Sequence, residues 1–202
     1  MGCGMQKFIF YIAKLLCFLV FRLCFRIEVY GVDNIPRSGP FIVAANHCSF
    51  LDPPVIGHIS KRPLHYFANA GILQIPLLGR AVKILGGMPV YKDELSSISL
   101  RKGLRALIRG GGVVIFPEGT RSKVGERLPA KAGLGFLHAK SGAPVIPVRI
   151  VGTDKAWPAG AGFIRPCKIR VHVGRPFNMS GSNYSAIGEA VLGIIRDASR
   201  PQ

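Results

Sequence analysis

Three short, largely apolar runs recur along the chain, at residues 41–45, 113–116 and 145–151, with longer helix-like segments between them. Each run is too short for a typical helix and directly follows a Gly or a Pro. Such runs predict buried strands of the kind that α/β proteins place in a parallel sheet. The alternation of strands with helices therefore predicts an α/β fold with a mixed, largely parallel central sheet flanked by helices.

The remaining elements follow from local periodicity and from the positions of Gly and Pro. We expect further strands at residues 26–30, 64–68 and 167–173, and helices at residues 52–59, 93–109, 131–140 and 184–198. Residues 72–85 are apolar and are broken by Pro76 and Gly79, which predicts a bent helical hairpin. That hairpin would either line an apolar groove or belong to the ordinary core.

The N-terminal segment is strongly apolar but carries Lys7, Lys14 and Arg22. Its longest uncharged apolar stretch, at residues 15–21, falls far below the ~20 residues that span a bilayer. On a helix, these charges and that of Arg26 lie within about one third of the circumference. The pattern predicts a basic amphipathic helix that lies in the interface of an anionic membrane.

Other interpretations of this segment are a tilted membrane span with snorkelling charges and an ordinary core helix. A signal peptide fits less well, because no small-residue cleavage site follows the apolar part. The favoured organisation is a membrane-associating helix at residues 1–25 and one domain at residues 26–202, at the cytoplasmic face of a membrane.

The charge balance is strongly basic, with 27 Lys and Arg against 10 Asp and Glu and a formal net charge of +17. Nucleic acid, an anionic membrane surface and an acidic protein are the partners that such a balance attracts. No basic motif is interleaved with aromatic residues, so we expect no nucleic acid partner. The five cysteines are odd in number and lack metal-ligand spacing, which indicates reduced thiols and no metal site.

The run at residues 41–45 ends abruptly in Asn46 and His47, and Asp52 follows five residues after the histidine. Asp is a good helix N-cap, and the two prolines after Asp52 are tolerated in a first helical turn, so a helix should begin there. The layout of strand, tight loop and helix places an imidazole and a carboxylate at the carboxyl end of a strand. Open α/β sheets keep their sites at that end.

The chemistry of His47 and Asp52 follows from their pairing. A neutral imidazole is a base that works near pH 7, and a carboxylate on its other nitrogen fixes the tautomer and stabilises the imidazolium. Such a pair can take a proton from a hydroxyl that attacks an acyl group, with no serine and no metal. The alternatives are a surface histidine beside a helix-capping aspartate, and a nucleophilic Cys48 activated by His47.

A second motif, F-P-E-G-T-R-S at residues 116–122, follows the run at residues 113–116. It presents a glycine turn, two hydroxyls and the guanidinium of Arg121, whose planar fork matches the oxygens of a phosphate. Glu118 lies three residues earlier and is placed to orient Arg121. The alternative is a structural ion pair between Glu118 and Arg121 in a surface turn.

The two motifs together resemble the glycerolipid acyltransferase family. Asn46, His47 and Asp52 match that family's N-H-x-x-x-x-D motif, and residues 116–122 match F-P-E-G-T-R-S without a change. Residues 145–148 resemble a further family block. The joint spacing of these blocks is more specific than either motif alone.

One family block is matched poorly, since only its Gly79 is present. Where the family commonly has Lys, Leu and Arg, this chain has Asn69, Ile72 and Lys92. A neutral Asn69 predicts that an acceptor phosphate is held less tightly than in the family, mainly by Arg121 with support from Lys92. The alternative is that Asn69 only caps the helix that follows it.

The resemblance implies that His47 is the general base on an acceptor hydroxyl and that Asp52 orients it. The hydroxyl would attack the thioester of acyl-CoA or of an acidic acyl-carrier protein, and a 1-acylglycerol-3-phosphate acceptor would give phosphatidic acid. No metal or redox cofactor is implied. The other residues that the family pattern assigns to substrate binding are Asn46, Gly79, Lys92, Glu118, Gly119, Thr120, Arg121 and Pro147, the last in an acyl-binding wall.

Two alternatives differ from this expectation. The same chemistry would serve another acceptor, such as a lyso-ornithine lipid or another lysophospholipid. A non-catalytic basic module that binds a membrane or nucleic acid is disfavoured, because a mere binder has no need of the intact pair of His47 and Asp52.

Overall fold

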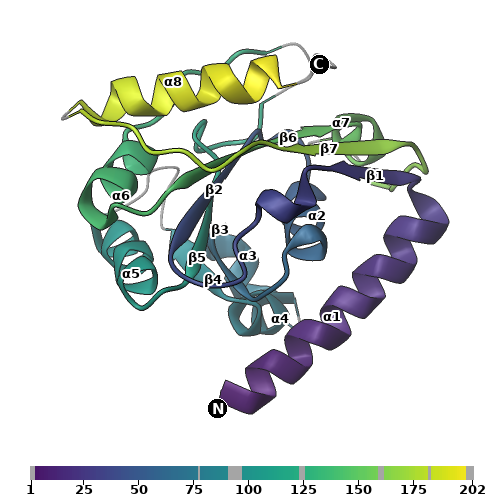
Figure 1. Cartoon of the computed structure of the whole chain (residues 1–202). Helices are drawn as coiled ribbons and strands as arrows, with labels where there is room; N and C mark the ends of the chain where they lie inside the picture. Colours follow the sequence, from purple (N-terminus) through teal and green to yellow (C-terminus); the bar gives the residue numbers. More distant parts are fainter. Residues whose placement is uncertain are drawn as a thin grey trace.

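The computed structural model describes residues 3–76, 78–90, 97–122, 126–158, 162–181 and 183–198. A seven-stranded sheet runs through the molecule in the order β1-β7-β6-β2-β5-β3-β4 (Figure 1). Every neighbouring pair of strands is parallel except β6 and β7, which are antiparallel. The predicted mixed, largely parallel sheet is therefore confirmed.

The strands are β1 Ile27–Tyr30, β2 Phe41–Ala45, β3 Leu64–Asn69, β4 Gly87–Val90, β5 Gly112–Ile115, β6 Val145–Val151 and β7 Ile169–Val173. The helices are α1 Cys3–Cys24, α2 Asp52–Ile59, α3 Ala70–Gln74, α4 Leu78–Ile84, α5 Ser97–Ile108, α6 Gly133–Ser141, α7 Thr153–Ala156 and α8 Tyr184–Asp197, with a 3-10 turn η1 at Val32–Asn34.

β2 lies near the centre of the sheet and divides its side chains between two cores. Phe41, Val43 and Ala45 belong to the cluster beneath α2, while Ile42 and Ala44 belong to the cluster beneath α5, α6 and α8. All five are fully buried, so this strand is apolar on both faces. The two layers of helices lie on opposite sides of the sheet in Figure 1.

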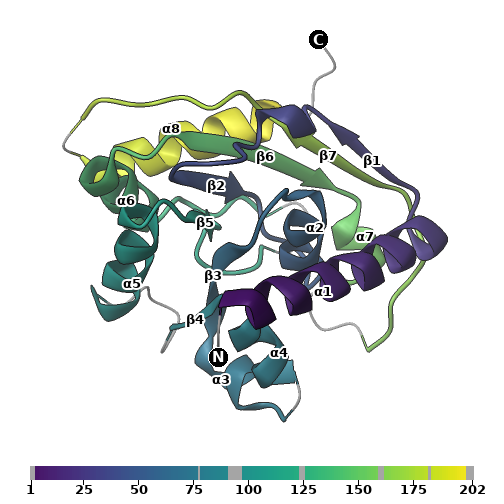
Figure 2. The ribbon, with the colours of Figure 1, turned by 60° about the horizontal axis from the view of Figure 1, so that its bottom comes forward.

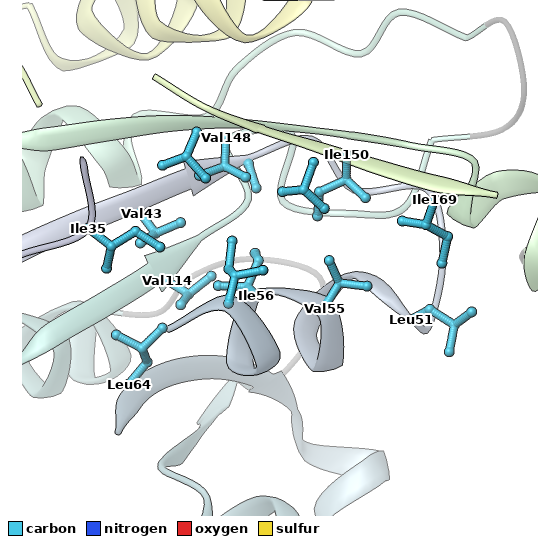
Figure 3. Close-up of a cluster of buried hydrophobic side chains, with 14 of the residues drawn as sticks. Ile35, Val43, Leu51, Val55, Ile56, Leu64, Val114, Val148, Ile150 and Ile169 are labelled. Atoms are coloured by element: carbon cyan, nitrogen blue, oxygen red, sulfur yellow. The ribbon is translucent and has the colours of Figure 1, made fainter. Parts of the chain in front are cut away.

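The α2 face of the sheet is held by aliphatic side chains. Figure 3 shows Val55 and Ile56 of α2 pointing toward Val148 and Ile150 of β6. All four are at most 1% exposed. Burial of a side chain of this size stabilises a fold by about 1.5–3 kcal/mol, so this packing fixes the start of α2 against the sheet.

The sequence predicted several bounds correctly, including β2, β6 and α2. The hairpin at residues 72–85 is present as α3 and α4, which are separated around Pro76. β4, η1 and α7 were not predicted. β4 contains Gly87 and Pro89, which normally argue against a strand, and Pro is tolerated there because β4 is the edge of the sheet.

One face of α1 packs against α2 (Figure 2). Phe21 and Phe25 are buried, and the ring of Phe21 contacts that of His58 at 5.4 Å between centroids. Nζ of Lys14 donates to the main-chain carbonyl of Ser60 at 2.6 Å. Lys14 therefore faces the domain.

The outer side of α1 carries mostly apolar side chains, with Arg22 exposed among them. Its exposed large side chains recur every three or four residues, which places them on one side of the helix. They are Phe8, Tyr11, Ile12, Leu15, Phe18, Leu19 and Leu23, of which Phe18 also stacks on His58. By length and hydropathy, none of the helices in the described ranges could cross a bilayer.

Candidate active site

His47 and Asp52 lie together beyond the carboxyl end of β2, where α2 begins. Nδ1 of His47 is 2.9 Å from Oδ2 of Asp52. The Asp52 side chain is fully buried, and the His47 side chain is 18% exposed. Because a carboxylate only accepts, Nδ1 carries the hydrogen of this bond, and the lone pair of His47 lies on Nε2. The arrangement can therefore accept a proton at Nε2.

Asp52 also organises the loop between β2 and α2. Its Oδ2 accepts hydrogen bonds from the main-chain N–H groups of Cys48, at 2.7 Å, and Ser49, at 2.8 Å. We expected Asp52 to cap the helix that it begins, but its carboxylate turns back to the preceding loop and the N-cap position is Leu51. The tight loop, rather than helix capping, aims the carboxylate at His47.

The loop at residues 116–122, which follows β5, holds the main chain of His47 from both sides. Oε2 of Glu118 accepts a hydrogen bond from the His47 N–H at 2.9 Å. The N–H and the hydroxyl of Ser122 both donate to the His47 carbonyl, at 2.9 and 3.1 Å. The ring of Phe116 stacks on the imidazole with centroids 4.1 Å apart. The two sequence motifs thus form one structural unit.

Glu118 and Arg121 do not pair with each other, contrary to both interpretations of the sequence. Among the ion pairs of the described residues, none joins them. The guanidinium of Arg121 lies over the ring of Phe50 at 3.6 Å from its centroid, a cation–π arrangement. Nη1 of Arg121 is buried and has no hydrogen-bond partner within the described ranges. A guanidinium held in this way keeps donor capacity for an anion.

Gly119 and Thr120 form the exposed tip of this loop. Gly119 has a φ of 70°, a conformation that favours glycine, and its N–H donates to the carbonyl of Phe116 at 2.9 Å. A Cβ at Gly119 would come within 2.7 Å of Cδ of Lys131, so the lysine side chain lies close to Gly119. Lys131 lies outside both motifs, and no sequence signal pointed to it.

Burial shifts two ionisable groups at the site. It raises the pKa of Glu118 above the usual range, against the opposing effect of the hydrogen bond from the His47 N–H. Burial, with the nearby charge of Asp52, raises the pKa of the Cys48 thiol to about 12. Since the thiolate is the nucleophile, a thiol with this pKa is inert at neutral pH. This argues against Cys48 as an activated nucleophile.

Comparison with known proteins identifies the family. The sequence model of the family described as Acyltransferase matches residues 26–151 of the 202. The chain belongs to the Acyltransferase family. This match includes both motifs and extends across the sheet from β1 to β6.

Two relatives similar to this chain carry one activity in their names. The chloroplastic 1-acyl-sn-glycerol-3-phosphate acyltransferase of Brassica napus is 33% identical over 175 residues, covering 85% of this chain and 51% of that protein. That of Arabidopsis thaliana is 33% identical over 179 residues, covering 87% and 50%. The chain therefore spans about half the length of these plant relatives.

A solved structure supports the fold. The crystal structure of the 1-acyl-sn-glycerophosphate acyltransferase of Thermotoga maritima superposes with a TM-score of 0.81 at 27% sequence identity. The superposition covers 95% of this chain and 79% of that one. The arrangement of strands and helices is therefore that of an Acyltransferase family member.

Two residues that the family pattern assigned to substrate binding make structural contacts. Nδ2 of Asn46 donates to the carbonyl of Ile150 at 2.9 Å, and its Oδ1 accepts from the Ile150 N–H at 2.7 Å. Asn46 therefore ties the end of β2 to β6. Gly79 is buried, and a Cβ there would collide with the main-chain carbonyl of Leu73, so Gly79 permits the close approach of α3 and α4.

Pro147 was expected in an acyl-binding wall. Neighbours Ile146 and Val148 belong to the cluster beneath α2, so alternation along β6 turns Pro147 to the opposite face of the sheet. It is buried there and packs close to Gly174. Pro147 therefore lies on the sheet face opposite α2, and its expected role in an acyl-binding wall stays a prediction. The expectation for Lys92 falls outside the described residues.

Asn69 acts as the N-cap of α3, which was the alternative left open by the sequence. Its Oδ1 accepts a hydrogen bond from the N–H of Gly71 at 2.8 Å. A short side chain with an oxygen acceptor, such as that of Asn, suits this position.

The sequence did not predict a role for Phe50, although this residue lies inside the first motif. Its cation–π contact is with Arg121 of another loop, and the sequence of neither loop indicates that contact. In the described part of the chain, no group of three or more His, Cys, Asp or Glu side chains is placed to hold a metal ion.

Proposed function

We propose that this chain transfers a fatty acyl group from acyl-CoA or acyl-carrier protein to the free hydroxyl of 1-acylglycerol-3-phosphate, giving phosphatidic acid. The observation that carries the proposal is the 2.9 Å contact between Nδ1 of His47 and Oδ2 of Asp52. It fixes the imidazole in the tautomer whose Nε2 is a base. Membership of the Acyltransferase family and the names of the relatives support the same reaction.

In the proposed reaction, Nε2 of His47 takes the hydroxyl proton as the acceptor oxygen attacks the thioester carbonyl. A carbon–oxygen bond forms, and the tetrahedral intermediate then expels the thiolate as the carbon–sulfur bond breaks. The imidazolium returns its proton to the thiolate, so the base is regenerated. Asp52 stabilises the imidazolium between these steps. General-base catalysis of this kind contributes about 10²–10⁴-fold to a rate.

The acceptor phosphate is assigned to Arg121. Its guanidinium lies over the ring of Phe50, and its buried Nη1 has no partner among the described residues. Ser122, the next residue, is hydrogen-bonded to the carbonyl of His47. A phosphate on Arg121 would therefore lie near the base, as the short glycerol backbone of this acceptor requires.

Membrane association is assigned to the outer side of α1. An acceptor with a long acyl chain resides in a bilayer, and a helix with a continuous apolar side can lie in the bilayer surface. Arg22 and Arg26 are exposed near the end of this helix, where they would meet anionic head groups.

Thiol release by the purified full chain, supplied with acyl-CoA or acyl-carrier protein, tests the proposed function. Release should require an acceptor, and mass spectrometry should identify phosphatidic acid when 1-acylglycerol-3-phosphate is supplied. The His47→Ala variant is the matched negative control. Failure of every acceptor and both donors to support release above that control would refute the proposal.

A second acceptor class is favoured by one observation. Asn69 carries no charge and its Oδ1 is engaged as a helix cap, so it adds no positive charge to phosphate binding. A lyso-ornithine lipid or another lysophospholipid, compared with 1-acylglycerol-3-phosphate at equal concentration in the same assay, tests this alternative. A higher kcat/KM for such an acceptor would replace the first assignment while keeping the same chemistry.

A further inference from the structure

A second concave site lies between α5 and the outer strands β3 and β4. It is a cavity of about 420 Å³ that opens to solvent. Its described lining consists of His65, Met88, Lys102, Arg105, Ala106, Arg109 and Gly111. Neither of the two motifs contributes to it.

The site is strongly cationic. Lys102 and Arg105 lie on α5, and Arg109 directly follows it, with its N–H donating to the carbonyl of Arg105 at 3.1 Å. The spacing of three and four residues places the three side chains on the same side of this segment. No acidic residue occurs among the described lining residues. Within the described ranges, none of these three side chains makes a hydrogen bond or an ion pair. Like charges at this spacing repel one another, so the helix gains nothing from them by itself.

A nearby arginine shows the contrast. The guanidinium of Arg62 donates to the main-chain carbonyls of Gly39 and Gly110 and lies over the ring of Phe41. Arg62 is therefore a structural residue with defined partners. The cations of the cavity have no such partners and are available to a ligand.

The cavity is separate from the candidate active site. Gly111 directly precedes β5, and His65 is the second residue of β3. His47 and Glu118 instead follow the carboxyl ends of β2 and β5. Because β2, β5 and β3 are parallel, the cavity lies at the amino ends of these strands and the candidate active site lies at their carboxyl ends. α5 also lies on the sheet face opposite α2 (Figure 1).

We propose that this cavity binds the phosphate group of a phosphate ester, at a site distinct from the acyl-transfer centre. Two guanidinium forks and one ammonium match the geometry and charge of a phosphate. His65 adds an imidazole, which donates or accepts according to its tautomer. Met88 and Ala106 supply an apolar floor for the group that the phosphate carries. A soluble phosphate ester and a lipid head group share this chemistry.

Methionine-methyl NMR of the full chain gives a readout at the site itself. Met88 lines the cavity, while Met179 lies in the segment between β7 and α8 and serves as an internal reference. Titration with inorganic pyrophosphate should shift the Met88 methyl resonance saturably and leave that of Met179 unchanged. No shift of Met88, or equal shifts of both, would overturn the proposal.

Variants of equal net charge separate this site from general attraction by a chain of charge +17. Arg105→Gln with Arg109→Gln should raise the pyrophosphate Kd at least tenfold, whereas Arg37→Gln with Arg175→Gln, two exposed positions elsewhere, should change it less than twofold. Equal losses in the two double variants would attribute binding to net charge and sink the proposal. A folded state common to both is checked by the Met179 resonance and by thermal unfolding.

Two further measurements define the ligand and keep this site distinct from the proposed function. The Kd values of ADP and of dihexanoyl phosphatidic acid, the latter below its micelle concentration, are compared with that of sulfate. Tighter binding of ADP would identify a soluble phosphate ester as the ligand, and tighter binding of the phosphatidic acid would identify a lipid head group. If neither binds more tightly than sulfate, the site is not one for phosphate esters. Arg121→Gln should leave pyrophosphate binding at Met88 unchanged, whether or not acyl transfer is detected. Loss of the Met88 shift in that variant would assign the anion to the other site.

Discussion

The carboxylate of Glu118 accepts a hydrogen bond from the main-chain N–H of His47 at 2.9 Å, across 71 residues of sequence. With Ser122 bound to the His47 carbonyl, the loop after β5 fixes the peptide groups on both sides of the proposed base. The second motif therefore has two functions in one loop. Glu118 and Ser122 position His47, and Arg121 remains available for an anion.

The first prediction concerns the pair itself. His47→Ala should lower kcat by at least 10²-fold, because the base is removed, and Asp52→Asn should lower it severely as well. Cys48→Ser should retain most activity, because the thiol has a pKa of about 12 and carries no nucleophilic role. Initial rates of thiol release measure all three. A His47→Ala variant with more than about a tenth of the wild-type rate contradicts the assignment of the base.

The second prediction separates positioning from binding at Glu118. Glu118→Ala leaves the buried His47 N–H unpaired, a loss of about 1.5–3 kcal/mol, and should lower kcat by roughly 10- to 100-fold. Glu118→Gln keeps an acceptor oxygen and should recover most of that loss. If the defect of Glu118→Ala falls entirely on the acceptor KM, the residue contacts substrate rather than His47.

The stability of the Glu118→Gln variant relative to wild type should also depend on pH. Burial raises the folded-state pKa of Glu118 above its unfolded value near 4.5, so the charged form is disfavoured in the folded protein. The protonated Glu118 carboxyl therefore stabilises the fold below pH 4.5, and this contribution is lost as the pH rises through the pKa of Glu118 in the folded protein. The Tm of Glu118→Gln relative to wild type should therefore increase from pH 4 to pH 7, as differential scanning calorimetry can test.

The sequence was sufficient to predict the bounds of an element where the residues of that element alone determine them. The runs at residues 41–45 and 145–151 are apolar enough to be buried whatever surrounds them, and their bounds were predicted correctly. It failed where a partner is distant. The i, i+3 spacing of Glu118 and Arg121 predicted a local contact, whereas His47 and Phe50 compete for those side chains from another loop. The side of the sheet toward which Pro147 points likewise depends on how β6 pairs with β2, a strand distant in the sequence.

The third prediction concerns the outer side of α1. Leu15→Asp with Leu19→Asp places two carboxylates in the apolar stripe and should abolish flotation with anionic vesicles, while leaving thermal stability nearly unchanged because both side chains are exposed. Ile108→Asp with Ile194→Asp, at exposed positions on α5 and α8, is the control with the same charge change. Equal loss of flotation in the two pairs would remove the special role of α1.

The fourth prediction is a pH dependence of the contact between α1 and α2. His58 lies against Phe18 and Phe21, and burial together with Lys14 holds its pKa below the usual 6.5. For a histidine with a lowered folded-state pKa, stability is complete above pH 6.5 and falls as the pH drops toward the folded pKa. The Tm of the wild type should therefore fall more between pH 7.5 and 5 than that of His58→Gln. Parallel Tm curves would contradict this role, since His65, which is also shifted, is present in both proteins.

The last prediction concerns Arg121. Its planar fork is oriented by the ring of Phe50, and one of its nitrogens is buried without a partner among the described residues. Arg121→Ala removes charge-assisted hydrogen bonds worth about 1.5–3 kcal/mol and should raise the acceptor KM roughly 10- to 100-fold, with little change in the donor KM. Arg121→Lys should recover only part of this, because an ammonium cannot make the bidentate contact.

Phe50→Leu tests whether the ring orients the guanidinium without touching the phosphate. Loss of a cation–π contact of about 0.5–1 kcal/mol should raise the acceptor KM by roughly two- to fivefold. In the Arg121→Ala background the same change should have no further effect, because the ring then has no guanidinium to hold. Steady-state kinetics of the two single variants and the double variant measure this coupling. Additive effects would mean that Phe50 contacts the acceptor itself, and an unchanged acceptor KM in Arg121→Ala would move phosphate recognition away from this loop.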